Sequence, residues 1–140
     1  MKLVFPFDPV PKGRPRFNGH AYTPKRTRDA EKAIREYASL IWKGEAIDKP
    51  IVVNFTFRFK VSKSWAKSKK EKALSGELKH VSRPDRDNLE KMVSDALNGI
   101  VWVDDSQIYD GRSRKEYAEH GEIVVEIGEE DGRENGTGSA

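Results

Sequence analysis

Four carboxylates and one lysine are closely spaced in the second half of the sequence. Asp85 and Asp87 are followed by Lys91, and the pair Asp104 and Asp105 stands a short distance further along. Carboxylates held close together repel one another, so they stay ionised at neutral pH only by binding hard cations or sharing protons. Oxygen ligands without cysteine or a nearby histidine suit Mg²⁺ or Mn²⁺ better than zinc. Such ions can activate water and stabilise a phosphate under attack, with Lys91 as a complementary point charge.

The residues between these acids predict a helix followed by a reversal of the chain. Apolar residues recur at the spacing of a half-buried helix, at Leu89, Met92, Val93, Ala96, Leu97 and Ile100. Asp87 and Glu90 are expected as N-cap and N3 of a capping box, and Gly99 as the C′ residue that ends the helix. About twelve helical residues advance roughly 18 Å, and five or six extended residues retrace about that distance. We therefore expect all four carboxylates to meet at the start of the helix.

The same residues also permit a purely structural interpretation. Asp87 can serve only as a helix cap, and Lys91 only as the partner of Asp87 and Asp95 in a ladder of surface charges. Asp104 and Asp105 can belong to an ordinary turn. Spacing alone does not exclude this interpretation.

Five segments around these acids form a longer pattern. They are PDRDNLEK (84–91), DALNG (95–99) and WVDDSQI (102–108), preceded by KGRPR (12–16) and AYTP (21–24). This pattern resembles the signature of RusA-type Holliday-junction resolvases, with the segments in the family's order and the similarity spread over most of residues 3–127. A signature of several parts is far more specific than a single Asp-x-Asp.

The resemblance implies a crossover junction endodeoxyribonuclease that depends on Mg²⁺, with Mn²⁺ as a possible substitute. It implies that Asp85, Asp87 and Asp105 are catalytic metal ligands and that Lys91 is the catalytic lysine. Asp104 matches the motif as a further candidate ligand. The implied partners are a branched DNA, the four-way junction, and a second copy of the chain, because a two-fold dimer supplies the two sites that two symmetric cuts require.

The charge distribution also favours a phosphate-rich partner. The net charge is +3, and the last twelve residues contribute −3, so residues 1–128 carry +6. Candidate DNA-binding residues lie in an arm rich in proline and glycine, in a lysine-rich helix and in a later strand. They are Lys12, Arg14, Arg16, Lys25, Arg26, Lys67, Lys69, Lys70 and Lys115. A lysine-rich face can equally be ordinary solvated surface, and Lys115 an ordinary surface lysine.

Two features of the sequence near these basic residues allow alternatives. Phe17, His20 and Tyr22 can stack on unpaired bases at a branch point, although alternating aromatic residues in a hairpin are also typical of a core. Arg86, where the family often has an apolar residue, can reach a phosphate or point to solvent.

Hydrophobic alternation and periodicity predict an α+β fold. Strands are expected at 2–7, 51–61, 107–117 and 121–127, and helices at 29–43, 64–74 and 88–98. We expect a mixed, mostly antiparallel sheet packed on one face by the helices of residues 29–43 and 88–98. The nuclease domain is expected to be a single domain over residues 1–128, followed by a disordered acidic tail over 129–140.

Composition excludes several classes of protein. The 140 residues contain no cysteine, so disulfides and thiolate chemistry are excluded. No apolar run approaches the ~18 residues of a membrane span, and no signal peptide is evident, so a cytoplasmic protein without a membrane partner is expected. Two other functions remain open, a non-catalytic protein that binds branched DNA and a metal-dependent phosphoesterase that acts on other DNA structures.

Overall fold

Strand β4 (Ile51–Lys60) is the centre of the sheet because its alternate residues are apolar. Ile51, Val53, Phe55 and Phe57 are almost fully buried, while the residues between them lie on the opposite, more exposed face. On one side, β4 pairs antiparallel with β7 (Glu122–Glu129), which in turn pairs antiparallel with β1 (Lys2–Phe5). On the other side, β4 pairs in parallel with two short strands. They are β5 (Ile108–Asp110) and β6 (Ser113–Ala118).

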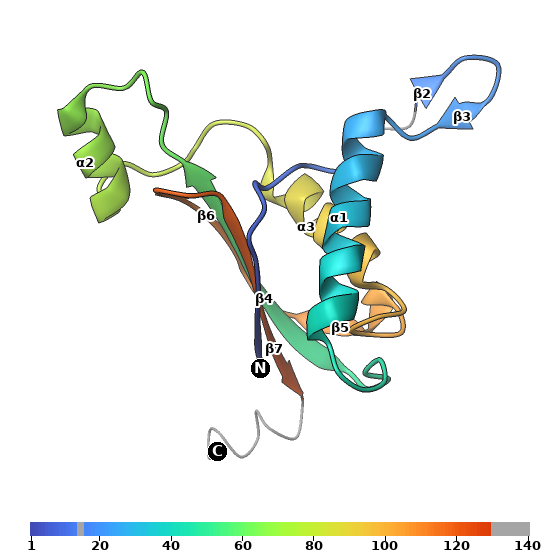
Figure 1. Cartoon of the computed structure of the whole chain (residues 1–140). Helices are drawn as coiled ribbons and strands as arrows, with labels where there is room; N and C mark the ends of the chain where they lie inside the picture. Colours follow the sequence, from blue (N-terminus) through green and yellow to red (C-terminus); the bar gives the residue numbers. More distant parts are fainter. Residues whose placement is uncertain (14–15, 130–140) are drawn as a thin grey trace.

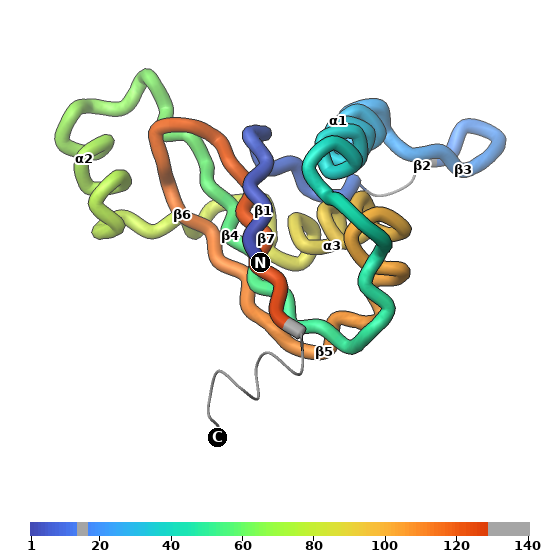
Figure 2. The backbone as a smooth tube through the Cα atoms, turned by 60° about the horizontal axis from the view of Figure 1, so that its bottom comes forward, coloured from blue at the N-terminus to red at the C-terminus, as the bar shows by residue number. Residues whose placement is uncertain are grey.

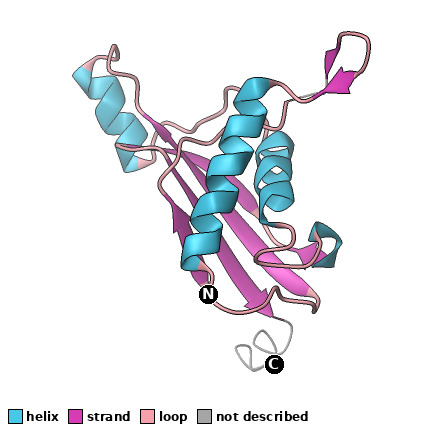
Figure 3. Ribbon diagram, turned by 45° about the vertical axis from the view of Figure 1, so that its right-hand side comes forward, coloured by secondary structure: helices cyan, strands magenta, loops and turns pink. Residues whose placement is uncertain are grey.

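The computed structural model describes residues 1–13 and 16–129 and confirms the predicted α+β architecture (Figure 1). The remaining elements are the helices α1 (Lys25–Ile41), α2 (Lys67–Ser75) and α3 (Arg86–Leu97), a 3₁₀ helix (Asp105–Gln107), and a hairpin of β2 (Arg16–Phe17) and β3 (Ala21–Tyr22). Helices α1 and α3 lie side by side on one face of the sheet (Figure 3). The predicted acidic tail lies outside the described residues, apart from Glu129, which ends β7.

One hydrophobic core joins the sheet to these two helices. Helix α3 contributes five buried apolar residues at helical spacing, Leu89, Met92, Val93, Ala96 and Leu97. They pack with Ile34 and Ala38 of α1 and with the buried residues of β1, β4 and β7. The predicted apolar face of α3 is therefore confirmed, except that Ile100 lies beyond the helix and is only partly buried.

Helix α1 begins earlier than the sequence predicted. Its first residue is Lys25 rather than Asp29, and Pro24 is its N-cap residue. Lys25 Nζ lies 2.7 Å from Asp29 Oδ2, an ion pair between residues four apart that stabilises a first helical turn. Lys25 and Arg26 therefore belong to a helix, and the prediction that they extend the exposed arm is wrong.

The capping box predicted for α3 is also wrong. Asp85 is the N-cap residue, with extended backbone angles, and it makes no side-chain capping bond. Its carbonyl oxygen accepts from the Leu89 N–H at 3.3 Å. Asp87 therefore lies inside the first turn, where its negative charge interacts favourably with the positive end of the helix dipole. Glu90 is not at position N3, so its side chain cannot form the predicted capping box.

The chain does reverse after α3, but through a compact turn rather than an extended strand. Gly99 has φ +82° and is the predicted C′ residue. Its N–H donates to the Trp102 carbonyl at 2.7 Å, and the fully buried Trp102 ring donates from Nε1 to Asn98 Oδ1 at 2.9 Å. Anchoring of Trp102 in the core shortens the return path, so residues 99–103 do not retrace the whole helix.

The strand predicted over residues 107–117 is split into β5 and β6 at Gly111. This glycine has φ +144°, and a Cβ atom there would overlap the backbone oxygen of Val53 in β4. The next N–H, of Arg112, leaves the ladder and donates to Asn54 Oδ1 at 2.9 Å. The kink lets β4 pair with two strands in succession along one edge.

Two elements project from this body. The β2–β3 hairpin extends beyond the N-terminal end of α1, and α2 lies at the opposite side of the molecule (Figure 2). Residues predicted to bind DNA lie on both projections, Arg16 in β2 and three lysines in α2. Lys67, Lys69 and Lys70 lie on α2, where Lys69 Nζ is 4.2 Å from the centre of the Trp65 ring.

Candidate active site

The exposed edge of α3 carries the predicted catalytic residues. Asp87 and Lys91 lie one turn apart on the same side of the helix, and Asp85 precedes its first residue. The carboxylates of Asp85 and Asp87 are exposed, and within the described chain neither takes part in a hydrogen bond or an ion pair. Both side chains are therefore available to a ligand.

Lys91 is held between two carboxylates. Its Nζ lies 3.1 Å from Asp95 Oδ1 and 4.0 Å from Asp105 Oδ2. Asp95 comes from the next turn of α3, whereas Asp105 comes from the 3₁₀ helix after the chain reversal. The tertiary structure thus brings the predicted pair of Lys91 and Asp105 together and adds Asp95, which the sequence suggested only as part of a surface ladder.

A second lysine extends this network toward α1. Lys12 Nζ lies 3.3 Å from Asp95 Oδ2 and 3.1 Å from Glu31 Oε1, and the Lys12 N–H donates to the Asn88 carbonyl at 2.9 Å. Burial by itself lowers the pKa of Lys12, but hydrogen bonds and attraction from Glu31 and Asp95 outweigh it and raise the pKa above its ordinary value. Predicted as a DNA contact, Lys12 ties the N-terminal segment to the site.

Asp104 has a local structural partner. Its side chain accepts from the Ser106 N–H at 3.0 Å, while the Asp104 N–H donates to Gln107 Oε1 at 2.8 Å, which is a capping box for the 3₁₀ helix. The Ser106 hydrogen bonds lower the pKa of Asp104. Gln107 in turn donates to the Ile47 and Lys49 carbonyls. Asp104 therefore fixes the turn that carries Asp105.

The predicted meeting of four carboxylates does not form in this structure. Asp105 lies beside Lys91, which is about 9 Å along the helix axis from the C-terminal end of α3. Asp85 lies roughly another 9 Å further along the axis, at the N-terminal end. Among residues 1–13 and 16–129, no group of three His, Asp or Glu side chains is close enough to hold a metal ion. The donors still fit a hard cation chemically, because all are carboxylate oxygens. A cation that binds Asp85, Asp87 and Asp105 must draw these side chains together.

Two side chains attach the segment before α3 to strand β6. Lys115 Nζ donates to the Ser82 carbonyl at 2.7 Å and to the Pro84 carbonyl at 2.9 Å. In the reverse direction, Arg86 donates to the Ser113 carbonyl at 2.9 Å. Neither use was foreseen from the sequence, because each depends on which strand lies beside the helix start. Lys115 and Arg86 thereby fix the backbone on either side of Asp85.

If the chain cuts DNA with Asp85 as a metal ligand, as the resemblance of its sequence implies, Lys115→Met is expected to slow cleavage by roughly ten- to a hundredfold, the usual effect of removing a group that orients a metal ligand. The reason is that Met cannot hold the Ser82 and Pro84 carbonyls. Steady-state kinetics should show the loss in kcat, with KM nearly unchanged. Lys43→Met, which removes an exposed lysine beyond the end of α1, is the matched control. A loss confined to KM would instead make Lys115 a DNA contact.

His80 lies beside Lys115 in an aromatic cluster. Its ring stacks on Phe59 with centroids 4.0 Å apart and lies 4.9 Å from Tyr117, and the buried Nδ1 has no hydrogen-bond partner within the described structure. Burial, with repulsion from Lys115, lowers the pKa of His80 below 6.5. His80 is therefore neutral in the folded protein at neutral pH.

The free energy of unfolding is expected to fall as the pH drops below about 6.5, because the unfolded chain then binds a proton on His80 that the folded chain resists. The loss is complete once the pH is below the folded pKa. Denaturant titrations between about pH 7.5 and 5.5 measure this dependence. His80→Phe should flatten the curve, while His120→Gln at an exposed position should not. Equal slopes in the wild type and His80→Phe would contradict the assignment.

A polar groove adjoins the exposed edge of α3. It has a volume of about 990 Å³ and is bordered by Asp87 and Glu90 of α3 and by Arg112 and Arg114 around the β5–β6 kink. Asp87 therefore lines this groove and also lies one helical turn from Lys91.

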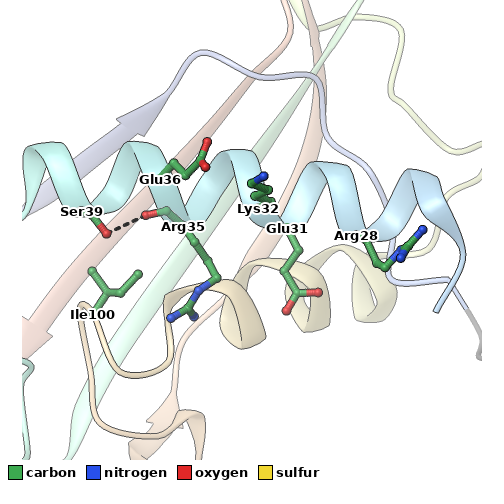
Figure 4. A pocket seen from close by; sticks show the side chains of 7 residues that line it. All are labelled: Arg28, Glu31, Lys32, Arg35, Glu36, Ser39 and Ile100. Atoms are coloured by element: carbon green, nitrogen blue, oxygen red, sulfur yellow. Dashed lines mark hydrogen bonds between the residues drawn. The ribbon is translucent and has the colours of Figure 1, made fainter. Parts of the chain in front are cut away.

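A different hollow, of about 490 Å³, lies along α1 near the end of α3 (Figure 4). In it, Arg35 reaches from α1 to the Ala96 and Asn98 carbonyls at 2.8 and 3.0 Å. A cation at the C-terminus of a helix satisfies free carbonyls and the helix dipole. This hollow is part of the packing of α1 on α3.

Other candidates from the sequence are placed separately. Arg14 lies outside the described residues, and Arg16 lies in β2. Arg26 borders a surface hollow with Arg83 and Pro84, close to the segment that leads to Asp85.

In the described part of the chain, no helix is long and apolar enough to cross a membrane.

Two comparisons with known proteins cover most of the chain. The model of the family Endodeoxyribonuclease RusA matches residues 6–128. The chain is also 35% identical over 131 residues to the uncharacterized protein YqaN of Bacillus subtilis (strain 168), an alignment that covers 87% of this chain and 91% of the relative. The family match includes α3, the 3₁₀ helix and strand β6, and therefore every element that forms the candidate site.

Proposed function

Because the chain belongs to the RusA family of endodeoxyribonucleases, we propose that it resolves Holliday junctions by paired, symmetric cleavage of phosphodiester bonds. The observation that supports this proposal best is the position of Lys91. The Lys91 ammonium group lies between Asp95 and Asp105, one turn from the unpaired Asp87, so a phosphate bound at these carboxylates through a metal ion would be within its reach. A binding module would have no need of carboxylates at that point, because they repel DNA.

In the proposed reaction, water attacks phosphorus and the bond to the 3′-oxygen breaks. A divalent cation, Mg²⁺ or Mn²⁺, would be held by Asp85, Asp87 and Asp105, with Asp104 as a further candidate, and would supply charge that stabilises the attacked phosphate. Lys91 stabilises the negative charge that develops on the phosphate or on the leaving oxygen. Asp95 orients Lys91, and Lys115 and Arg86 fix the backbone around Asp85.

Two copies of the chain are proposed to act together, since a four-way junction needs two cuts related by symmetry. The lysines of α2 and the basic residues at the start of α1 lie on opposite sides of the site, where they can hold the phosphates of different arms. Electrostatic contacts of this kind weaken as salt concentration rises.

The test is cleavage of a labelled synthetic four-way junction, compared with linear duplex and flap substrates, with and without Mg²⁺ or Mn²⁺. Paired symmetric nicks in the junction that require the divalent ion are the expected result. Equal cleavage of flaps or duplex would indicate a metal-dependent phosphoesterase with another DNA substrate. Tight junction binding without cleavage under any divalent ion would indicate a non-catalytic protein.

A further inference from the structure

The β2–β3 hairpin carries two exposed aromatic side chains. Phe17 is 76% exposed and Tyr22 is 41% exposed. Both lie outside the hydrophobic core, so the core role that the sequence also allowed is wrong for these residues. The hairpin stands away from the sheet beyond the start of α1 (Figure 1).

The register of the hairpin places these two rings on opposite faces. Phe17 is paired with Ala21, and Arg16 is paired with Tyr22. Residues directly opposite one another share a face, and successive residues alternate between faces. Phe17 therefore lies on one face and Tyr22 on the other. The result is a thin ribbon with one aromatic ring on each side.

Such a ribbon gains stability from a partner. Each strand has only two residues, and a two-stranded hairpin is marginal in water without further packing. The chain next to the hairpin is basic, with Lys25, Arg26 and Arg28 in the first turns of α1. Exposed aromatic rings beside cations are the chemistry that binds unstacked bases and their phosphates, because every base has a π face.

We propose that the hairpin enters the branch point of a four-way DNA junction and that Phe17 and Tyr22 stack on the bases exposed there. This inference rests on the proposed function. In the open form of a junction, where the arms are not stacked on one another, the central base pairs have no neighbour on one side, so their faces are open to stacking. A ribbon with a ring on each side can cover two such ends at once, which distinguishes a branch point from continuous duplex.

The experiment places 2-aminopurine either at the branch point or in the middle of one arm of a synthetic junction. Protein with Asp87→Asn is added in EDTA, so that strand cutting does not interfere. We expect a change in fluorescence at the branch point and none in the arm. Phe17→Ala and Tyr22→Ala should each weaken junction binding by roughly five- to a hundredfold and reduce the fluorescence change, whereas Tyr22→Phe should retain it.

Leu40→Ala is the control for loss of an exposed apolar side chain, because Leu40 is 70% exposed on the far part of α1. It should bind as the parent protein does. An unchanged fluorescence response in the double variant Phe17→Ala, Tyr22→Ala would overturn the proposal. Loss of self-association in that variant, with the response intact, would make the hairpin a contact between copies instead. The fluorescence experiment measures binding and not cleavage. A negative result would therefore contradict the hairpin proposal but not the proposed nuclease activity. If the protein did not cut DNA at all, the fluorescence result could still be interpreted.

Discussion

Replacing Asp87 with asparagine is expected to slow cleavage of a four-way junction by about a thousandfold or more, with junction binding retained. Removal of one group that stabilises developing charge typically costs a hundred- to a thousandfold, and Asp87 is also a proposed ligand of the divalent ion. Asparagine keeps the shape of the side chain but not its charge. Because Asp87 is exposed and unpaired within the described chain, the fold should survive, with at most about 1 kcal/mol lost from its favourable place near the helix N-terminus.

The rate of Asp87→Asn should be measured over a titration of Mg²⁺ and of Mn²⁺, beside thermal unfolding of the same preparation. Glu36→Gln, which makes the same change from carboxylate to amide at an exposed position of α1, is the matched control and should cut at the wild-type rate. Wild-type cleavage by Asp87→Asn would falsify the assignment of this carboxylate. If binding were lost together with cleavage, Asp87 would be contributing to recognition of the junction instead.

Lys91→Met is expected to lower kcat by roughly a hundredfold while KM changes little, because the charge is needed most where negative charge develops. Stability should change by less than about 0.5 kcal/mol, since the Lys91 side chain is 57% exposed and ion pairs at such positions contribute little. Single-turnover cleavage at saturating protein separates the chemical step from binding. Thermal unfolding provides the second readout.

The matched control for Lys91→Met is Lys32→Met, which removes an exposed lysine from α1. Asp95→Asn adds a finer comparison. If Asp95 orients Lys91 through the 3.1 Å ion pair, this variant should be slower than wild type but faster than Lys91→Met. An effect of Lys91→Met that lies wholly in KM, and that disappears at high protein concentration, would reassign Lys91 to phosphate binding.

Much of the fold could be predicted because local patterns and the core agree. The alternation of apolar residues in β4 and the apolar face of α3 mark the sides of these elements that are buried in the core, and both are confirmed. Helix starts were less predictable. We predicted Asp87 as the N-cap residue of α3, whereas the structure has Asp85 there, in a segment that Lys115 and Arg86 attach to β6.

The sequence by itself determined which residues are available for chemistry. The acids at 85, 87 and 105, the lysine at 91 and the multi-part signature are local facts, and they were sufficient to indicate the family that the comparison then showed. The predicted roles of these residues in cleavage stay predictions.

Only the tertiary structure decided how these side chains meet. Trp102, buried in the core, shortens the return of the chain, so that Asp105 meets Lys91 and not Asp85. Likewise, two lysines that were predicted to contact DNA have partners within the protein. Lys12 donates to Glu31, and Lys115 donates to backbone carbonyls near Asp85. These partners come from distant parts of the chain. They are close together only because the helices pack on the sheet, and the spacing of residues along the sequence does not predict that packing.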